Sequence, residues 1–89
     1  MKIIDGFVLR PLGEEFLVIG EGIFQINFNK MVSLNSSAAY LWQHVEGKEF
    51  TVADLADLLT DAYEVDAERA LKDAETLAAK WIEAGIVSE

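Results

Sequence analysis

The stretch MVSLNSSAAYLW, residues 31–42, constrains the fold more than any other part of this chain. Before it, apolar residues alternate or run together as in strands, and after it they recur every three or four positions as in helices. Asn35 is suited to be a helix N-cap, because its side-chain oxygen can accept from the backbone N–H of Ser37 or Ala38. Strands followed by helices predict an α+β domain rather than an alternating α/β one.

The residues before this boundary predict a small antiparallel sheet. Three short strands are expected at residues 7–12, 16–19 and 31–34, with a tight turn at Gly13-Glu14. Pro11 restricts the first strand to an edge or an end, since proline has no N–H to donate to a neighbouring strand. The stretch IFQINF, residues 23–28, is a further extended segment that would make a fourth strand.

Three helices are expected after the boundary. The first covers residues 36–46, with Gly47 as its left-handed cap. Thr51 caps the second, with Asp54 as a capping-box partner, and Asp66 caps the third, which ends at Gly85. The apolar stripe of the third helix is rich in alanine, which predicts a shallow groove along it: Ala67, Ala70, Leu71, Ala74, Leu77, Ala78, Trp81 and Ile82.

Charge is concentrated in the helical half of the chain. The 89 residues carry a net charge of −9, and residues 36–89 hold twelve of the 16 acidic side chains against four of the seven basic ones. A surface of that sign repels a phosphate backbone, and the chain has no basic stripe. A nucleic-acid-binding function is therefore disfavoured.

Residues for catalysis or metal binding are sparse. Cysteine is absent, which removes disulfides and thiolate chemistry, and His44 is the single histidine, with no nucleophile aligned to it. Asp54, Asp57 and Asp61 share one helix face, a pattern more typical of a solvated surface than of a metal site. No apolar run approaches the about 20 residues that span a bilayer. We expect a single cytoplasmic domain, residues 1–89, without enzymatic activity, cofactor or metal.

Several short stretches, in this order, carry a family resemblance. They are Leu34-Asn35 at the end of the third strand, SSAAYLW, Glu46-Gly47, TVADLADLL, AYEVD and the terminal EAGIV. Together with the order of strands and helices, they make the chain resemble the PqqD family, whose members are peptide-binding modules of pyrroloquinoline quinone biosynthesis. The wider group comprises the recognition elements for precursor peptides that are made on ribosomes and then modified. The resemblance extends over nearly the whole chain.

The resemblance implies a function and a site. Family members bind the leader segment of a precursor peptide as an extra strand on the third strand, in a cleft against the third helix. They present it to a modifying enzyme, commonly a radical SAM protein. Carried over to this chain, the receiving edge is Lys30, Met31, Val32, Ser33 and Leu34. The cleft wall is Ala67, Ala70, Leu71, Ala74 and Leu77, with Arg69 and Lys72 positioned to pair with acidic leader residues.

Two alternatives remain open at this point. Three helices with a small sheet are also typical of winged-helix nucleic-acid binders, although the acidic helical half argues against that function. A structural adaptor or dimerisation subunit without peptide affinity is the other. Residues 23–28 bear on both the edge and dimerisation, because pairing of this segment with residues 31–34 would block or move the site, and the same segment would favour a homodimer.

Overall fold

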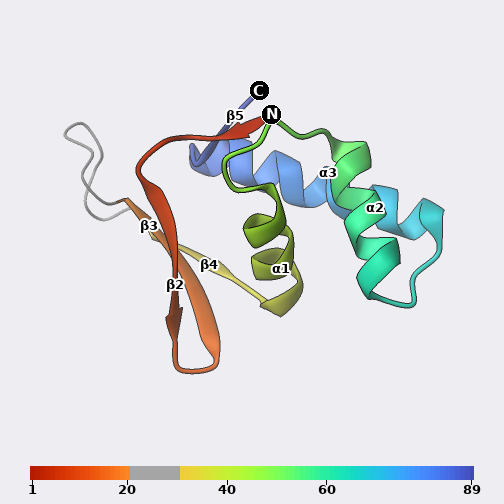
Figure 1. The fold of residues 1–89 in the computed structure, drawn as a ribbon, viewed down its shortest axis with the longest axis horizontal. Coiled ribbons are helices and arrows are strands. Elements are labelled where there is room, and N and C mark those ends of the chain that lie inside the picture. The colour runs from red at the N-terminus through yellow and green to blue at the C-terminus, as the bar shows by residue number, and fades with distance from the viewer. Residues whose placement is uncertain (21–30) are drawn as a thin grey trace.

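In the computed structural model, the strands of the main sheet precede the helices as the sequence predicts. The structure describes residues 1–20 and 31–89, so the predicted extended segment at 23–28 and Lys30 lie outside the described residues. Figure 1 shows a small sheet beside a layer of helices. In chain order the elements are β1 (Lys2–Ile3), β2 (Phe7–Leu12), β3 (Glu15–Gly20), β4 (Met31–Leu34), α1 (Ser36–Val45), α2 (Val52–Ala62), α3 (Ala67–Ala84) and β5 (Val87–Ser88).

The main sheet is antiparallel, with the strand order β2-β3-β4. In its register, Val18 of β3 lies opposite Leu9 on one side and Val32 on the other. Val18 is fully buried, and Leu34 is nearly so, because alternate residues of each strand face the helices. Gly13 turns the β2–β3 hairpin with a φ of +65°, a conformation that glycine adopts without steric cost.

The predicted caps at Asn35, Thr51, Asp66 and Gly85 are confirmed, whereas α1 ends at Val45 with Glu46 as its C-cap. Gly47, which was predicted as that cap, follows in the left-handed conformation at φ +74°. The Asn35 side chain accepts from the Ala38 N–H at the start of α1. Thr51 and Asp54 form a reciprocal capping box at α2, and Asp66 caps α3. Gly85 ends α3 in the left-handed conformation, at φ +78°. Each cap satisfies backbone groups that a helix end leaves without partners, which is why the sequence could place these boundaries.

A second, two-stranded sheet joins the two ends of the chain and was not predicted from the sequence. β1 pairs antiparallel with β5, placing Ile3 opposite Val87, and both side chains are buried. The Met1 amino group also donates to the Phe50 carbonyl over 2.7 Å. Strands of two residues are too short to show an alternating pattern, so only the tertiary contacts define them.

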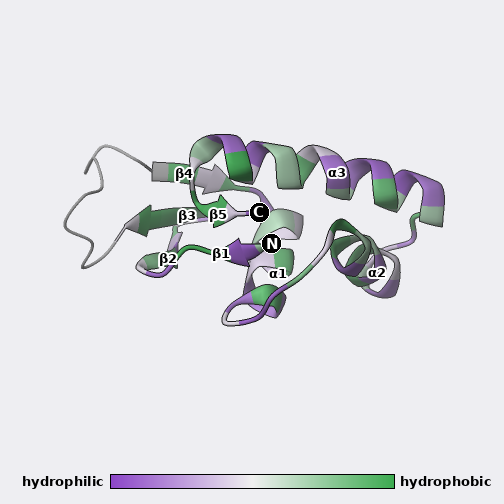
Figure 2. Cartoon of the chain, turned by 90° about the horizontal axis from the view of Figure 1, so that it is seen from above, coloured by the Kyte–Doolittle hydropathy of each residue, from purple (hydrophilic) through white to green (hydrophobic). Residues whose placement is uncertain are grey.

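The core lies where the three helices meet the sheet. Its largest fully buried side chains are Trp42 of α1 and Trp81 of α3. α3 packs mainly against α2, and α1 contacts all three strands of the main sheet. Seen from above, α3 is banded with apolar and polar residues along its length (Figure 2), which fits a helix with one face in the core.

Candidate functional site

β4 is an edge strand of the main sheet. Within residues 1–20 and 31–89 it pairs with β3 alone, so its second edge has no strand beside it there. In Figure 2 the strands follow one another from β2 through β3 to β4 toward the side on which α3 lies. An edge strand carries N–H and C=O groups that another chain can pair with. The open edge of β4 is therefore on the α3 side of the sheet.

A pocket of about 260 Å³ lies where β4 passes into α1 and faces α3. Its wall has a buried apolar part, formed by Ala38 and Leu41 of α1 and Leu59 of α2, with half-buried Leu77 beside them. The remaining lining side chains are polar: Asn35, Ser37, Asp73, Thr76 and Lys80. The exposed ones among them stand at the mouth, so the pocket has an apolar interior and a polar opening.

The N-cap of α1 shapes one side of this pocket. Asn35 Oδ1 accepts from the Ala38 N–H over 2.9 Å and from the Ser37 hydroxyl over 3.0 Å. Asn35 itself keeps an extended backbone, as N-cap residues do, while its side chain bonds to the first turn of α1. It is therefore the single residue between the end of β4 and the start of α1. The same residue thus defines the end of the open edge and the start of the pocket.

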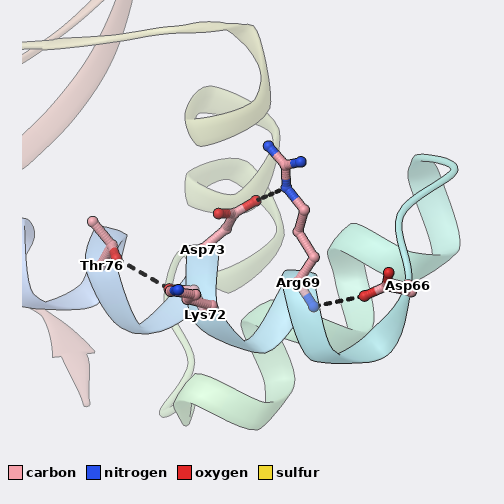
Figure 3. A network of polar contacts seen from close by, with 5 residues as sticks. All are labelled: Asp66, Arg69, Lys72, Asp73 and Thr76. Atoms are coloured by element: carbon pink, nitrogen blue, oxygen red, sulfur yellow. Dashed lines mark hydrogen bonds and ion pairs between the residues drawn. The ribbon is translucent and has the colours of Figure 1, made fainter.

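Two separate sets of polar contacts lie along the first half of α3, as Figure 3 shows. Arg69 Nε lies 3.7 Å from Asp73 Oδ2, and both side chains are largely exposed. The Asp66 carboxylate accepts from the Arg69 N–H over 2.7 Å, and the Thr76 hydroxyl donates to the Lys72 carbonyl over 3.1 Å. An exposed ion pair of this kind contributes about 0–1 kcal/mol to stability.

A second hollow continues along α3 from the first. It has a volume of about 470 Å³ and is lined by charged residues only: Asp66, Glu68, Arg69, Lys72 and Asp73. Asp73 belongs to both hollows, so they adjoin on one face of the helix. The result is a groove that is apolar near α1 and charged toward the start of α3.

The structure places the residues predicted on β4 as follows. Met31 begins the strand, Val32 is half-buried, Ser33 is exposed and Leu34 is buried. Val32 and Leu34 share the face of the sheet that packs on the core, because alternate residues of a strand point the same way. Their side chains are therefore largely committed to the core, and the strand offers its backbone as the contact surface.

The residues predicted on α3 separate into three groups. Leu77 lines the pocket beside α1, and Arg69 and Lys72 line the charged hollow. Ala67 and Leu71 are exposed and line neither. Ala70 and Ala74 are fully buried, so in this structure they allow close packing of α3 in the core instead of forming an open groove.

Sequence reasoning missed most of the pocket. Besides Leu77, none of its lining residues was predicted, although Asp73, Thr76, Leu77 and Lys80 recur at helical spacing on α3. That spacing marks the polar side of the apolar stripe and was available from the sequence. The contributions of Leu41 and Leu59 were not, because they depend on how α1 and α2 meet α3.

Two further findings concern the described residues alone. No group of three or more histidine and acidic side chains in residues 1–20 and 31–89 is placed to hold a metal ion. Over the same part of the chain, no helix has both the length and the apolar character required to cross a membrane.

Fold and site together define a class of protein: a small α+β domain in which a sheet edge, without a strand partner among the described residues, lies beside a groove on the last helix. The sequence matches the family described as coenzyme PQQ synthesis protein D (PqqD) over residues 9–87. The chain belongs to the PqqD family. No curated protein sequence matches it significantly.

Two solved structures are similar in fold. One is described as TbiB1 in complex with the TbiA(beta) leader peptide, and it matches with a TM-score of 0.75 at 18% identity, covering 99% of this chain and 95% of that one. The other is a lasso peptide synthetase B1 complexed with the leader peptide, with a TM-score of 0.75 at 20% identity, covering 99% and 96%. At these identities the likeness demonstrates a shared fold.

Proposed function

We propose that this protein is a non-catalytic recognition module that binds the leader segment of a ribosomally made precursor peptide. Membership of the PqqD family supports this function, as does the shared fold with two proteins whose structures hold leader peptides. The observation that carries it is the edge of β4, which has no strand partner in the described residues and runs toward the pocket beside α3.

Strand addition is the binding mode that this geometry favours. In an antiparallel sheet, the N–H and C=O of one residue point to the same neighbour, and successive residues point to opposite neighbours. Two of the four residues of β4 therefore offer their backbone groups to an added strand, enough for about four hydrogen bonds. The peptide backbone would provide the affinity, and side chains that enter the groove would provide the specificity.

The expected affinity is moderate. About four backbone hydrogen bonds contribute about 0.5–1.5 kcal/mol each, and one or two buried apolar side chains add about 1.5–3 kcal/mol each, a gross total of up to about 12 kcal/mol. After the peptide has lost conformational freedom, this corresponds to a dissociation constant on the order of micromolar. Binding of that strength suits a module that must release its peptide to a second protein.

The remaining parts of the proposal concern the partner proteins. The module would present its bound peptide to a modifying enzyme, for which the family resemblance favours a radical SAM protein. A cytoplasmic location and a homodimer stay predictions from the sequence. The assembly is tested by mixing the purified chain with the modifying enzyme encoded beside it. A complex whose stability increases with the leader peptide is expected.

Peptide binding is tested by calorimetric titration. The ligand is a synthetic leader segment of the precursor encoded next to the gene for this chain. Micromolar binding with a stoichiometry of one peptide per chain is expected. Absence of heat and of any competition at a peptide concentration of 1 mM, roughly a thousand times the expected dissociation constant, would overturn the proposed function.

A further inference from the structure

The pocket at the end of β4 has features that select for particular side chains. Its interior is formed by Ala38, Leu41, Leu59 and Leu77, and these aliphatic residues offer no polar group to a ligand. The volume of about 260 Å³ is below the about 300–1,000 Å³ of pockets that enclose whole drug-sized ligands. One large apolar side chain, rather than two, suits a space of this size and lining.

The mouth of the pocket carries one acidic side chain, Asp73, and one basic side chain, Lys80, and only the acidic one has an oppositely charged partner among the described residues. The Asp73 carboxylate lies 3.7 Å from the Arg69 guanidinium, which offsets its charge. The Lys80 side chain forms no hydrogen bond or ion pair with any part of the chain that the structure describes. A ligand therefore meets an uncompensated positive charge at the Lys80 side of the mouth.

This charge stands out because of its surroundings. Residues 36–89 carry a net charge of −8, which repels an acidic ligand from most of the helical surface. Lys80 and Leu77 are three residues apart on α3, about 4.5 Å along the helix axis. Side chains on one face of an added strand are about 6.6 Å apart, two residues along the peptide. An apolar side chain in the pocket thus places the residue two positions away within reach of Lys80.

We propose that the pocket reads a two-residue pattern in the peptide: a large apolar residue buried against Leu41, Leu59 and Leu77, and an Asp or Glu two positions away that pairs with Lys80. This inference rests on the proposed function, because it specifies the class of peptide taken by the same groove. It assigns specificity to Lys80, whereas Arg69 already pairs with Asp73 and Lys72 lies outside the pocket.

The test begins with a phage-displayed library of random 12-residue peptides selected on the immobilised full chain. We expect enrichment of sequences that combine a Leu, Ile, Met, Phe, Tyr or Trp with an acidic residue two positions from it. A synthetic peptide of the enriched sequence and its counterpart with Asn or Gln in place of the acid are then titrated. The amide counterpart should bind about three- to fivefold more weakly, as expected for one exposed ion pair.

Charge reversal on the protein provides the matched comparison. Lys80→Glu should lower the affinity for the acidic peptide about three- to fivefold or more. It should also shift library selection toward Lys or Arg at the peptide position that otherwise holds the acid. Lys48→Glu makes the same charge change at an exposed lysine that lines neither hollow on α3, and it should leave both the affinity and the selected sequences unchanged. An equal effect of the two variants would show that only net charge matters and would overturn the role of Lys80.

The apolar part of the pattern is tested in the same way. Leu77→Ala should lower the affinity for the enriched peptide at least tenfold. Leu71→Ala should leave this affinity unchanged, because it truncates an exposed leucine of the same helix that lies outside the pocket. Circular dichroism checks that both variants are folded. If Leu77→Ala does not fold, replacing the apolar residue of the peptide by Ala against the unmodified chain gives the same comparison.

The outcomes separate the two levels of the proposal. Selected peptides that lack the apolar and acidic pair, but lose binding when the β4 edge is blocked by proline, would overturn the pattern and retain strand addition. Peptides that bind equally to edge-blocked variants would overturn strand addition. A library that yields no binding peptide would overturn both.

Discussion

Trp42 and Trp81 contact each other edge to face in the centre of the core, with ring centroids 5.4 Å apart and an interplanar angle of 87°. Both are fully buried, and neither indole N–H has a hydrogen-bond partner within the described residues. Phe50 adds a further edge-to-face contact with Trp81, at 6.4 Å. This aromatic cluster connects α1 to α3, the two helices that supply most of the pocket lining.

Truncation of Trp81 should therefore destabilise the whole domain. We expect Trp81→Ala to lower the free energy of unfolding by about 3–5 kcal/mol, because it removes a buried aromatic side chain and leaves a cavity. Trp81→Phe should cost less, since it keeps a ring against Trp42 and removes an unpaired donor. Urea unfolding followed by the fluorescence of Trp42 measures both. A loss below 1 kcal/mol for the alanine variant would contradict the central position of this contact.

Proline substitutions in β4 should distinguish its two edges. Val32 and Ser33 are consecutive, so their N–H groups point to opposite sides of the strand. One of Val32→Pro and Ser33→Pro should remove a bond to β3 and lower stability, and the other should keep the fold and weaken peptide binding at least tenfold. Thermal unfolding and peptide titration of both variants provide the comparison. Two stable variants with unaltered affinity would contradict strand addition at β4.

The cap at Asn35 should matter for binding as well as for stability. Asn35→Ala is expected to cost about 1 kcal/mol of stability, because the Ala38 N–H loses its acceptor, whereas Asn35→Asp keeps that acceptor. Thr51→Ala removes the equivalent cap from α2 at a comparable cost, at a residue that lines neither hollow of the groove. Only the change at Asn35 should also weaken peptide binding. Equal peptide affinities of the two alanine variants would show that the start of α1 does not shape the site.

The end of α3 depends on one backbone conformation. Gly85 has a φ of +78°, and its N–H bonds to carbonyls of the last helical turn. Gly85→Ala should cost about 1–2 kcal/mol, because a Cβ atom is strained in the left-handed region, and Gly85→Asn should cost less. Denaturant unfolding measures both variants. Alanine as stable as glycine at this position would contradict the described cap.

Local signals explain why much of the fold was predictable. Residues 7–12 and 31–34 were predicted as strands with the bounds that the structure has, and the caps at Asn35, Thr51 and Asp66 follow from side chains that bond to their own helix. Such features need no knowledge of distant residues. The pairing of β1 with β5 was missed for the opposite reason, since it joins residues at the two ends of the chain.

The site was less predictable because packing decides it. Periodicity shows that Ala70 and Ala74 lie on the apolar stripe of α3, but it does not show whether a stripe is covered by the core or open to a ligand. The structure buries both alanines and opens the adjacent face, where Leu77 and Lys80 stand. The helix named from the sequence thus lines the pocket, mostly through residues on the face next to the predicted stripe, and its role in peptide binding stays a prediction.

The central claim is that a peptide strand adds to β4 beside α3, and amide mapping by nuclear magnetic resonance tests it most directly. The leader segment of the neighbouring precursor is titrated into the ¹⁵N-labelled chain, and amide exchange is compared with and without peptide. The account predicts the largest shifts at residues 32–34 and 73–80, with new exchange protection at the outward amides of β4. Shifts and protection confined to β2 or to the exposed face of α2 would contradict it.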